Sequence, residues 1–227
     1  MISILLTQTT AADVAVSEQS YNLFSMAAKG GFLMLVLLAL SILAIYIFGQ
    51  KWWLIRNAGK IDSNFMKDIR VLIHEGKIKS ALNLCDKYDS PVARMVRKGI
   101  ERIGRPINDI HTSVENVGNA EVARLEKGLP ILATISGGAP MIGFLGTVLG
   151  MIKAFFNMAQ ASNNVDISLL SSGIYTAMVT TVGGLVLGIL AHFGYNYLTS
   201  KISDLVFKME SATIDFMDVL NEPVSED

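Results

Sequence analysis

Two threonines lie midway along apolar stretches of the chain, and each stands among small residues spaced three or four positions apart. On a helix this spacing places all members of a set on one side. The first set consists of Ala139, Gly143, Thr147, Gly150 and Ala154. The second set consists of Ala177, Thr181, Gly184, Gly188 and Ala191. A hydroxyl can donate and accept hydrogen bonds, so both sets are candidates for handling a polar group inside an apolar medium.

Three interpretations of these two small-residue strips are open from the residues alone. Glycine and alanine let helix backbones approach closely in lipid, so the strips could serve packing only. A threonine can also satisfy itself by donating to the carbonyl four residues earlier. Because Thr147 and Thr181 are matched, we favour a narrow polar path, or contact with a polar group on a helix packed against the strips. Antiparallel packing would place the two hydroxyls at similar depth.

Ionisable residues are absent from the middle of every long apolar stretch. A protein that moves ions across a membrane usually needs such a group, and the one titratable candidate, His192, lies near the end of its stretch. Lys153 lies at the end of another stretch, where its ammonium can reach the lipid headgroups. If protons cross here, the carboxylate that binds them must come from another chain.

No pattern typical of a soluble catalytic site is visible in the sequence. It lacks a glycine-rich phosphate loop followed by lysine, a metal-spaced His or Cys cluster, and a nucleophile–His–acid set. His74, His111 and His192 are scattered. We therefore expect no enzyme activity, no cofactor and no metal. The single cysteine, Cys85, excludes an intrachain disulfide and is expected to be buried.

The elements that must position the threonines are long apolar helices. Of the 227 residues, 51% are hydrophobic and 17% are charged, and the mean hydropathy is +0.44. A soluble domain carries more charge. Three stretches are free of Asp, Glu, Lys and Arg and long enough to cross a bilayer, namely 30–50, 128–152 and 167–200. Strand signals are absent, so the sequence predicts an all-α membrane protein with three transmembrane helices.

Basic residues predict the orientation. Of the 19 Lys and Arg residues, 15 lie between Lys51 and Lys127. Segments rich in these residues stay in the cytoplasm, so we expect the N-terminus outside and the C-terminus inside. The predicted outer segments are 1–29, with a short amphipathic helix, and the loop 154–167. The predicted transmembrane helices are 30–50, 128–153 and 168–198. The predicted cytoplasmic parts are a helical domain at 51–127 and a helix with an acidic tail at 199–227.

Start and stop signals divide the 51–127 segment into short helices. Asp62 or Ser63 can cap a helix that Gly76 ends. Ser90 followed by Pro91 starts another helix, since proline suits the first helical position. These helices have one apolar face each, as helices packed in a small bundle should.

The second and third transmembrane helices are expected to run beyond the membrane. No strong breaker separates the helix after Gly104 from the second apolar stretch, so one continuous helix is expected. The third stretch would reach roughly 50 Å at about 1.5 Å per residue, well past a hydrocarbon core of about 30 Å. Its continuation after Lys201 carries an apolar stripe of Ile202, Leu205, Val206, Met209 and Ile214.

Two long motifs in these apolar stretches resemble the MotA/TolQ/ExbB proton-channel family, on its ExbB/TolQ side. They are "APxxGxLGTVxGMIxAF" in the second stretch and "GIxxAxxTTxxGL" in the third. The similarity extends to "AKGGFLMLVLLALSILAIYIF" and "SPVARMVRKGI", and it covers roughly residues 20–215.

The resemblance implies an ExbB-like subunit of a pentameric ring in the bacterial inner membrane, with its outer segments in the periplasm. Two copies of an ExbD- or TolR-like partner would stand inside the ring and supply a transmembrane aspartate. Proton motive force would move the partner, and the motion would pass to a TonB- or TolA-like protein. By this resemblance the pore is lined by Thr147, Thr181, Thr180 and Thr176. The residues packed around the partner helices would be Ala139, Pro140, Gly143, Gly146, Gly150, Ala177, Gly184 and Gly188.

Two positions depart from the family pattern. Thr176 stands where many members have glutamate, and Leu190 replaces a proline. A proton step on a ring glutamate is therefore in doubt, and a straighter third helix is expected. A TolQ-type role in envelope constriction, a gliding or secretion energiser, and a non-conducting scaffold are the alternatives. A stand-alone transporter would need an internal charge or an inverted repeat, and neither is visible.

Overall fold

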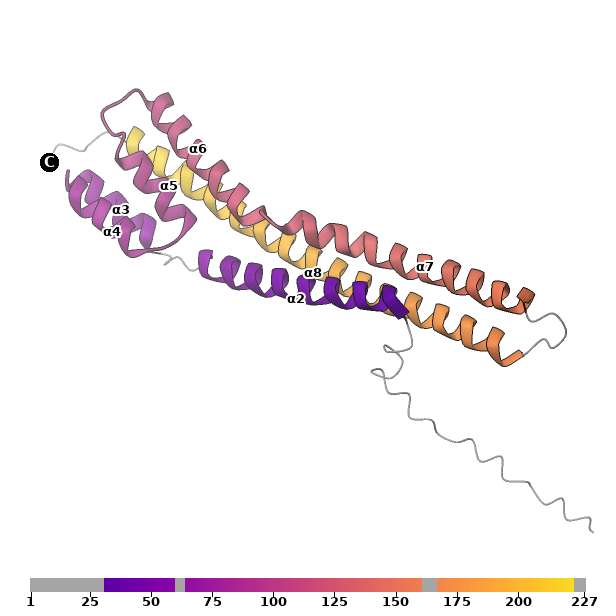
Figure 1. Cartoon of the computed structure of the whole chain (residues 1–227). Coiled ribbons are helices and arrows are strands. Elements are labelled where there is room, and N and C mark those ends of the chain that lie inside the picture. The colour runs from indigo at the N-terminus through magenta and orange to yellow at the C-terminus, as the bar shows by residue number, and fades with distance from the viewer. Residues whose placement is uncertain (1–30, 60–63, 161–166, 223–227) are drawn as a thin grey trace, which may run out of the picture.

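The computed structural model describes residues 31–59, 64–160 and 167–222, and these ranges are helical apart from short turns. The helices are α2 (Gly31–Ala58), α3 (Phe65–His74), α4 (Ile78–Lys87), α5 (Pro91–Ile100), α6 (Ile107–Glu126), α7 (Leu129–Gln160) and α8 (Ile167–Asn221) (Figure 1). The amphipathic helix predicted within 1–29, the caps predicted at Asp62 or Ser63, and the end of the acidic tail lie outside the described residues.

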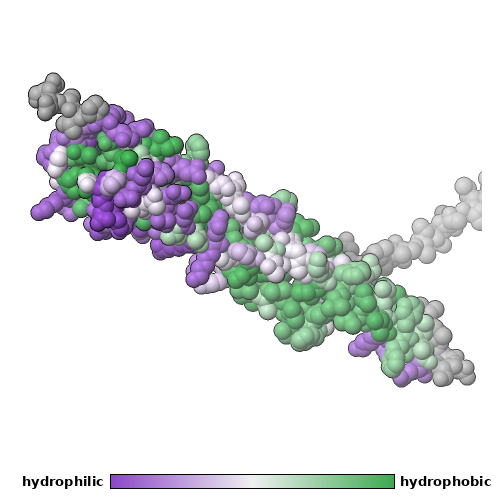
Figure 2. Space-filling view, turned by 90° about the horizontal axis from the view of Figure 1, so that it is seen from above, coloured by the Kyte–Doolittle hydropathy of each residue, from purple (hydrophilic) through white to green (hydrophobic). Residues whose placement is uncertain are grey.

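Three long helices, α2, α7 and α8, lie side by side and form the apolar end of the molecule (Figures 1 and 2). Each is long and apolar enough to cross a membrane, which confirms the three predicted spans. α7 and α8 are antiparallel, because Ala139 lies opposite Gly184 and Ala154 lies opposite Gly173. α2 runs parallel to α8, since Met34 contacts Gly183 and Phe48 contacts Gly194.

The boundaries of two long helices differ from those predicted for the spans. α2 continues to Ala58, and α7 continues past Lys153 to Gln160. α7 is prolonged because it stays in contact with α8, where Ala154 packs against Gly173. Residues 154–160 of the predicted outer loop are therefore helical.

α8 is a single helix of 55 residues. At about 1.5 Å per residue it is roughly 80 Å long, so it spans both the apolar and the polar end of the molecule. In its polar half Ile202, Leu205 and Met209 are buried, as predicted, but Ile214 is 62% exposed. Ile214 is five residues past Met209, about 140° around the helix. The buried stripe continues instead through Ala212, Phe216 and Val219.

The expected continuous helix between 105 and 152 is wrong, because the chain breaks between α6 and α7. Gly128 has φ +94°, a conformation that residues with a Cβ rarely adopt. Lys127 before it is non-helical, and Pro130 after it lacks the N–H that a helix interior needs. The break gives α6 and α7 independent directions, so α6 joins the polar bundle while α7 follows α8.

The polar end of the molecule is a small bundle in which α3, α5 and α6 pack against the last part of α8, and α4 packs against α3 and α5 (Figure 1). Phe65 and Phe216 are among its fully buried side chains. α5 approaches α8 very closely at Gly99, where an added Cβ would clash with the ring of Phe216. Two predicted boundaries are confirmed here. Gly76 ends α3 at φ +68°, and the Ser90 hydroxyl accepts from the Ala93 amide at 3.2 Å to cap α5.

Cys85 is 3% exposed in this bundle, which confirms the prediction that it is buried. Burial raises the pKa of its thiol from 9.0 to about 12, and the negative charge of Asp86 adds to the effect. The thiol therefore stays protonated at physiological pH. Its role is that of a small apolar core residue.

Candidate functional site

The small-residue strips of α7 and α8 face each other within one chain. A Cβ added to Gly143 would lie 3.1 Å from the Thr180 carbonyl oxygen and 3.2 Å from the Gly184 Cα. A Cβ added to Gly184 would lie 2.5 Å from the Ala139 carbonyl oxygen. The two backbones are thus in direct contact, and the absence of side chains is what allows that contact.

The same close approach extends along the whole interface. Added Cβ atoms would lie 2.5 Å from Pro140 Cγ at Gly188, 2.8 Å from Thr180 Cβ at Gly146, and 2.7 Å from Ala177 Cβ at Gly150. The packing of these residues around another chain's helices stays a prediction, but within one chain the gaps between the strips are occupied. α8 fills the gaps on α7, and α7 fills those on α8, because both strips consist of small residues and their backbones can come into contact.

The hydroxyl of Thr181 joins the two helices. Its Oγ1 donates to the Gly143 carbonyl oxygen at 2.9 Å. This bond crosses from α8 to α7, and Thr181 itself is half-buried. The sequence indicated a polar role for this residue but not the carbonyl that it contacts, since that partner is set by the register of the packed helices.

The hydroxyl of Thr147 is bound only within its own helix, at 2.6 Å from the Phe144 carbonyl oxygen. Thr147 is half-buried at the edge of the α7–α8 contact. Gly146, which precedes Thr147, packs against Thr180, which precedes Thr181, so the two threonines lie within about one helical turn of each other in depth. The structure therefore brings them to similar depth, as antiparallel packing required. A local bond of this kind can be exchanged by rotation about χ1 without separating the helices.

Thr180 and Thr176 lie on the α8 side of the same interface. Thr180 is 2% exposed, packs against Gly146, and donates to the Thr176 carbonyl oxygen at 2.8 Å. Thr176 is half-buried. Of these two predicted pore residues, Thr180 is thus enclosed between the helices, whereas Thr176 lies nearer the surface.

The predicted packing residues divide into two groups by exposure. Ala139, Gly143, Gly146, Ala177, Gly184 and Gly188 are buried between α7 and α8. Pro140 and Gly150 are half-buried. Another chain can therefore reach the second group without displacing a helix.

Charge is absent from the middle of this site. No Asp, Glu, Lys or Arg occurs between 128 and 152 or between 167 and 200. His192 lies toward the polar end of the molecule, where its Nε2 is 3.0 Å from the amide nitrogen of Asn196. Among the described residues, no group of three or more His, Cys, Asp or Glu side chains could hold a metal ion. The site can therefore offer hydroxyls and carbonyls, but no charge of its own.

A buried lysine at the edge of the apolar region escaped the sequence analysis. Lys51 is 7% exposed, and its ammonium donates to the Arg124 carbonyl oxygen at 3.1 Å. This bond attaches α2 to the end of α6 at the level of the α6–α7 break. Its position directly after a charge-free stretch was the signal available in the sequence.

Comparison with known proteins agrees with this geometry, in which charge-free membrane helices pack through small residues and present hydroxyls. Residues 87–211 match the MotA/TolQ/ExbB proton channel family. Because the match covers more than half of the chain, the protein belongs to this family.

Relatives bear both ExbB and TolQ names. The ExbB biopolymer transport protein of Aquifex aeolicus is 32% identical over 148 residues, covering 64% of this chain and 93% of the relative. The TolQ protein of the Pseudomonas aeruginosa Tol-Pal system is 26% identical over 202 residues, covering 84% of this chain and 87% of the relative. A protein of Methanothermobacter thermautotrophicus, named as an ExbB homolog, is 25% identical over 190 residues, covering 83% and 67%.

Proposed function

We propose that the chain is an ExbB-type subunit of a proton-driven motor in the bacterial inner membrane. An ExbD-like partner supplies a transmembrane aspartate, and the partner's movement is passed to a TonB-like protein for import across the outer membrane. The observation that carries the proposal is the pairing of α7 with α8, which lacks charge at mid-span yet presents the half-buried Thr147 hydroxyl.

The electrostatics of the membrane support a role for Thr147. An ionised carboxylate in hydrocarbon is very unfavourable unless donors meet it. When the hydroxyl of Thr147 turns away from the Phe144 carbonyl, it donates to such a carboxylate and stabilises its charged form. The membrane potential supplies about 2.3 kcal/mol per proton at 100 mV, so a few protons can drive mechanical work.

The other threonines have distinct proposed roles. Thr181 holds α7 to α8 by donating to the Gly143 carbonyl, and its hydroxyl oxygen keeps both lone pairs for accepting a proton-path hydrogen bond. Thr176 stands on the path at another level, and Thr180 maintains the close contact with Gly146. The partner helices then pack against half-buried Pro140 and Gly150.

A pentameric ring accounts for the apolar surface of α7. Large side chains there are between 43% and 73% exposed, and they include Met141, Phe144, Leu145, Leu149, Met151 and Ile152. They meet neighbouring copies of the chain or lipid. With 15 of 19 basic residues between Lys51 and Lys127, the polar bundle lies in the cytoplasm and the far end of α7, near Gln160, faces the periplasm.

Replacing Thr147 with valine tests the proposal, because valine keeps the shape and removes the hydroxyl. We expect T147V to assemble normally with its partner and to lose about ten- to hundredfold of the proton-driven activity. This range corresponds to one hydrogen bond to a charged group. Proton flux of the complex in proteoliposomes is the measurement. Full proton flux in T147V would contradict the proposed role of Thr147, whereas a wild-type complex without proton flux would favour the non-conducting scaffold.

Thr134 provides the matched control. It is exposed on the same helix and donates to the Pro130 carbonyl oxygen at 2.8 Å, as Thr147 does to its own helix. It lies about 20 Å from Thr147 along the helix axis. T134V should therefore leave proton flux unchanged.

A TolQ-type role is the second candidate, favoured by the Pseudomonas aeruginosa relative that covers 84% of this chain. The two roles use the same proton step and differ in the protein that receives the motion. Co-purification from the native membrane decides between them. A TonB-like companion supports import, and a TolA-like companion supports envelope constriction.

A further inference from the structure

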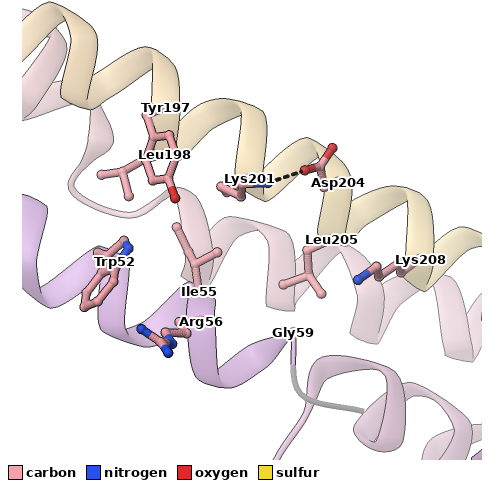
Figure 3. Close-up of a pocket in the computed structure, with 10 residues that line it drawn as sticks. All are labelled: Trp52, Ile55, Arg56, Gly59, Tyr197, Leu198, Lys201, Asp204, Leu205 and Lys208. Carbon is pink, nitrogen blue, oxygen red and sulfur yellow. Dashed lines mark hydrogen bonds and ion pairs between the residues drawn. The ribbon is translucent and has the colours of Figure 1, made fainter. Parts of the chain in front are cut away.

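A pocket of about 460 Å³ opens between α2 and α8 at the end of the apolar region (Figure 3). It is separate from the α7–α8 interface. Its lining comes from the end of α2 and the middle of α8, namely Trp52, Ile55, Arg56, Gly59, Tyr197, Leu198, Lys201, Asp204, Leu205 and Lys208.

The pocket lies where both helices leave the apolar region. α2 and α8 run parallel, with Phe48 against Gly194. Their charge-free stretches end at Gln50 and Ser200, and the pocket's charged side chains follow directly on each helix. Its level therefore corresponds to the lipid headgroups on that side of the membrane.

Positive charge dominates the rim. The lining contains three cationic side chains, Arg56, Lys201 and Lys208, and one carboxylate, so its net charge is +2. The carboxylate, Asp204, is paired with Lys201 at 3.0 Å. Within the part of the chain that the structure describes, Arg56 and Lys208 have no carboxylate partner. Two cations are therefore available for an anion.

Aromatic and apolar side chains complete the pocket. The Arg56 guanidinium lies 5.2 Å from the Trp52 ring centroid, a contact that holds it over the pocket wall. Trp52 and Tyr197 are 40% and 47% exposed. Such rings prefer the boundary between lipid and water. Leu198 is buried beneath them.

We propose that this pocket binds the headgroup of an anionic phospholipid, with Arg56 and Lys208 on the phosphate. The aromatic rings and the apolar floor accept the glycerol end of the lipid. This combination distinguishes a lipid from free phosphate, which would gain nothing from them. The proposal requires only that α2 and α8 cross the membrane, so it stands independently of the proton path.

Fluorescence of Trp52 in the full-length protein tests the proposal. The chain has two tryptophans, so W53F leaves Trp52 as the only one. In detergent micelles we expect phosphatidylglycerol carrying a nitroxide near its headgroup to quench Trp52 at lower concentration than the same labelled phosphatidylcholine. Equal quenching by the two lipids would overturn the proposal.

Charge variants make the test specific. Each surface cation near an anionic lipid contributes about fivefold in affinity, so R56Q with K208Q should weaken phosphatidylglycerol binding about 25-fold. The charge-conserving pair R56K with K208R should retain most of it. K87Q removes an exposed charge on α4, far from the pocket, and should change nothing.

Two results would overturn the assignment. One is a double variant R56Q/K208Q that binds within twofold of K87Q, with far-UV circular dichroism unchanged in both. The other is inorganic phosphate that displaces labelled phosphatidylglycerol at a concentration as low as the unlabelled lipid does, which would indicate a site for free phosphate.

Discussion

Thr147 and Thr181 are matched in the sequence, yet their hydroxyls are bound differently. Thr181 donates across to the Gly143 carbonyl, whereas Thr147 donates to Phe144 in its own helix. A bond between helices contributes to stability, since breaking it leaves a carbonyl without its partner in an apolar medium. A bond within a helix can be exchanged at little cost. Thr147 is therefore the better candidate for meeting a partner's carboxylate.

This difference predicts how stability responds to the two substitutions. T181V should lower the free energy of unfolding by about 0.6 kcal/mol, the average for hydrogen bonds between membrane helices, and by no more than about 1.7 kcal/mol. T181S keeps the hydroxyl and should retain most of the stability. Unfolding in sodium dodecyl sulfate, followed by circular dichroism, gives the midpoints. If T147V destabilised the protein as much as T181V, the assignment of the two bonds would be wrong.

Cys85 gives a prediction in the polar bundle. With a pKa of about 12, only about 10⁻⁴ of the thiol is ionised at pH 8, against about a tenth of a cysteine with the ordinary pKa of 9.0. Dithiobisnitrobenzoate should therefore label the folded chain very slowly and the unfolded chain at once. Because the folded-state pKa is raised, stability should fall as pH rises from 9 toward 12. Fast labelling of the folded chain would contradict this environment.

At the level of elements, the contact between α7 and α8 depends on bare backbone. The sequence predicted both strips from their spacing, and the structure confirms that each is continuous on one side of its helix. It could not show what covers them, because a smooth strip fits a neighbouring chain and the same chain equally well. In the structure the register of the antiparallel pair α7 and α8 brings the two strips together.

The glycines of α7 and α8 differ sharply in the space around them, which gives a second stability prediction. G184A places a methyl group 2.5 Å from the Ala139 carbonyl oxygen and should destabilise the protein by about 1–3 kcal/mol. Unfolding in sodium dodecyl sulfate measures this loss.

Gly137 is the matched control for Gly184. It lies on α7 with nothing within 4 Å of an added Cβ. Because alanine favours helix over glycine, G137A should be neutral or stabilise by up to about 1 kcal/mol. A G184A variant as stable as G137A would show that the two helices do not approach as closely as described.

Local signals in the sequence were reliable where a turn or cap is decided by neighbouring residues. Ser90 with Pro91 marked the start of α5, and Gly76 marked the end of α3. The break at Gly128 was missed, because a glycine within an apolar stretch also fits a packed helix. The prediction that Ile214 belongs to the buried stripe was wrong, because five residues separate it from Met209 and place it about 140° around the helix.

At the scale of the whole molecule, one long helix connects two different environments. α8 packs through small residues and threonines at its apolar end and through large apolar side chains at its polar end. Because α8 is one continuous helix, a shift of its apolar half would also shift its polar half within the bundle. The sequence predicted the candidate site through the spacing of its small residues and threonines. The proposal that another chain supplies the proton carrier is based on the charge-free spans, which contain no carboxylate.

The most direct test of this account is proton flux through the purified chain in proteoliposomes, measured with and without its ExbD-like partner. Without the partner the spans offer only hydroxyls and carbonyls, so we expect flux no higher than that of empty vesicles. With the partner, flux should appear and should be lost when the partner's transmembrane aspartate is changed to asparagine. Full flux through the chain alone would contradict the claim that the proton carrier comes from another protein.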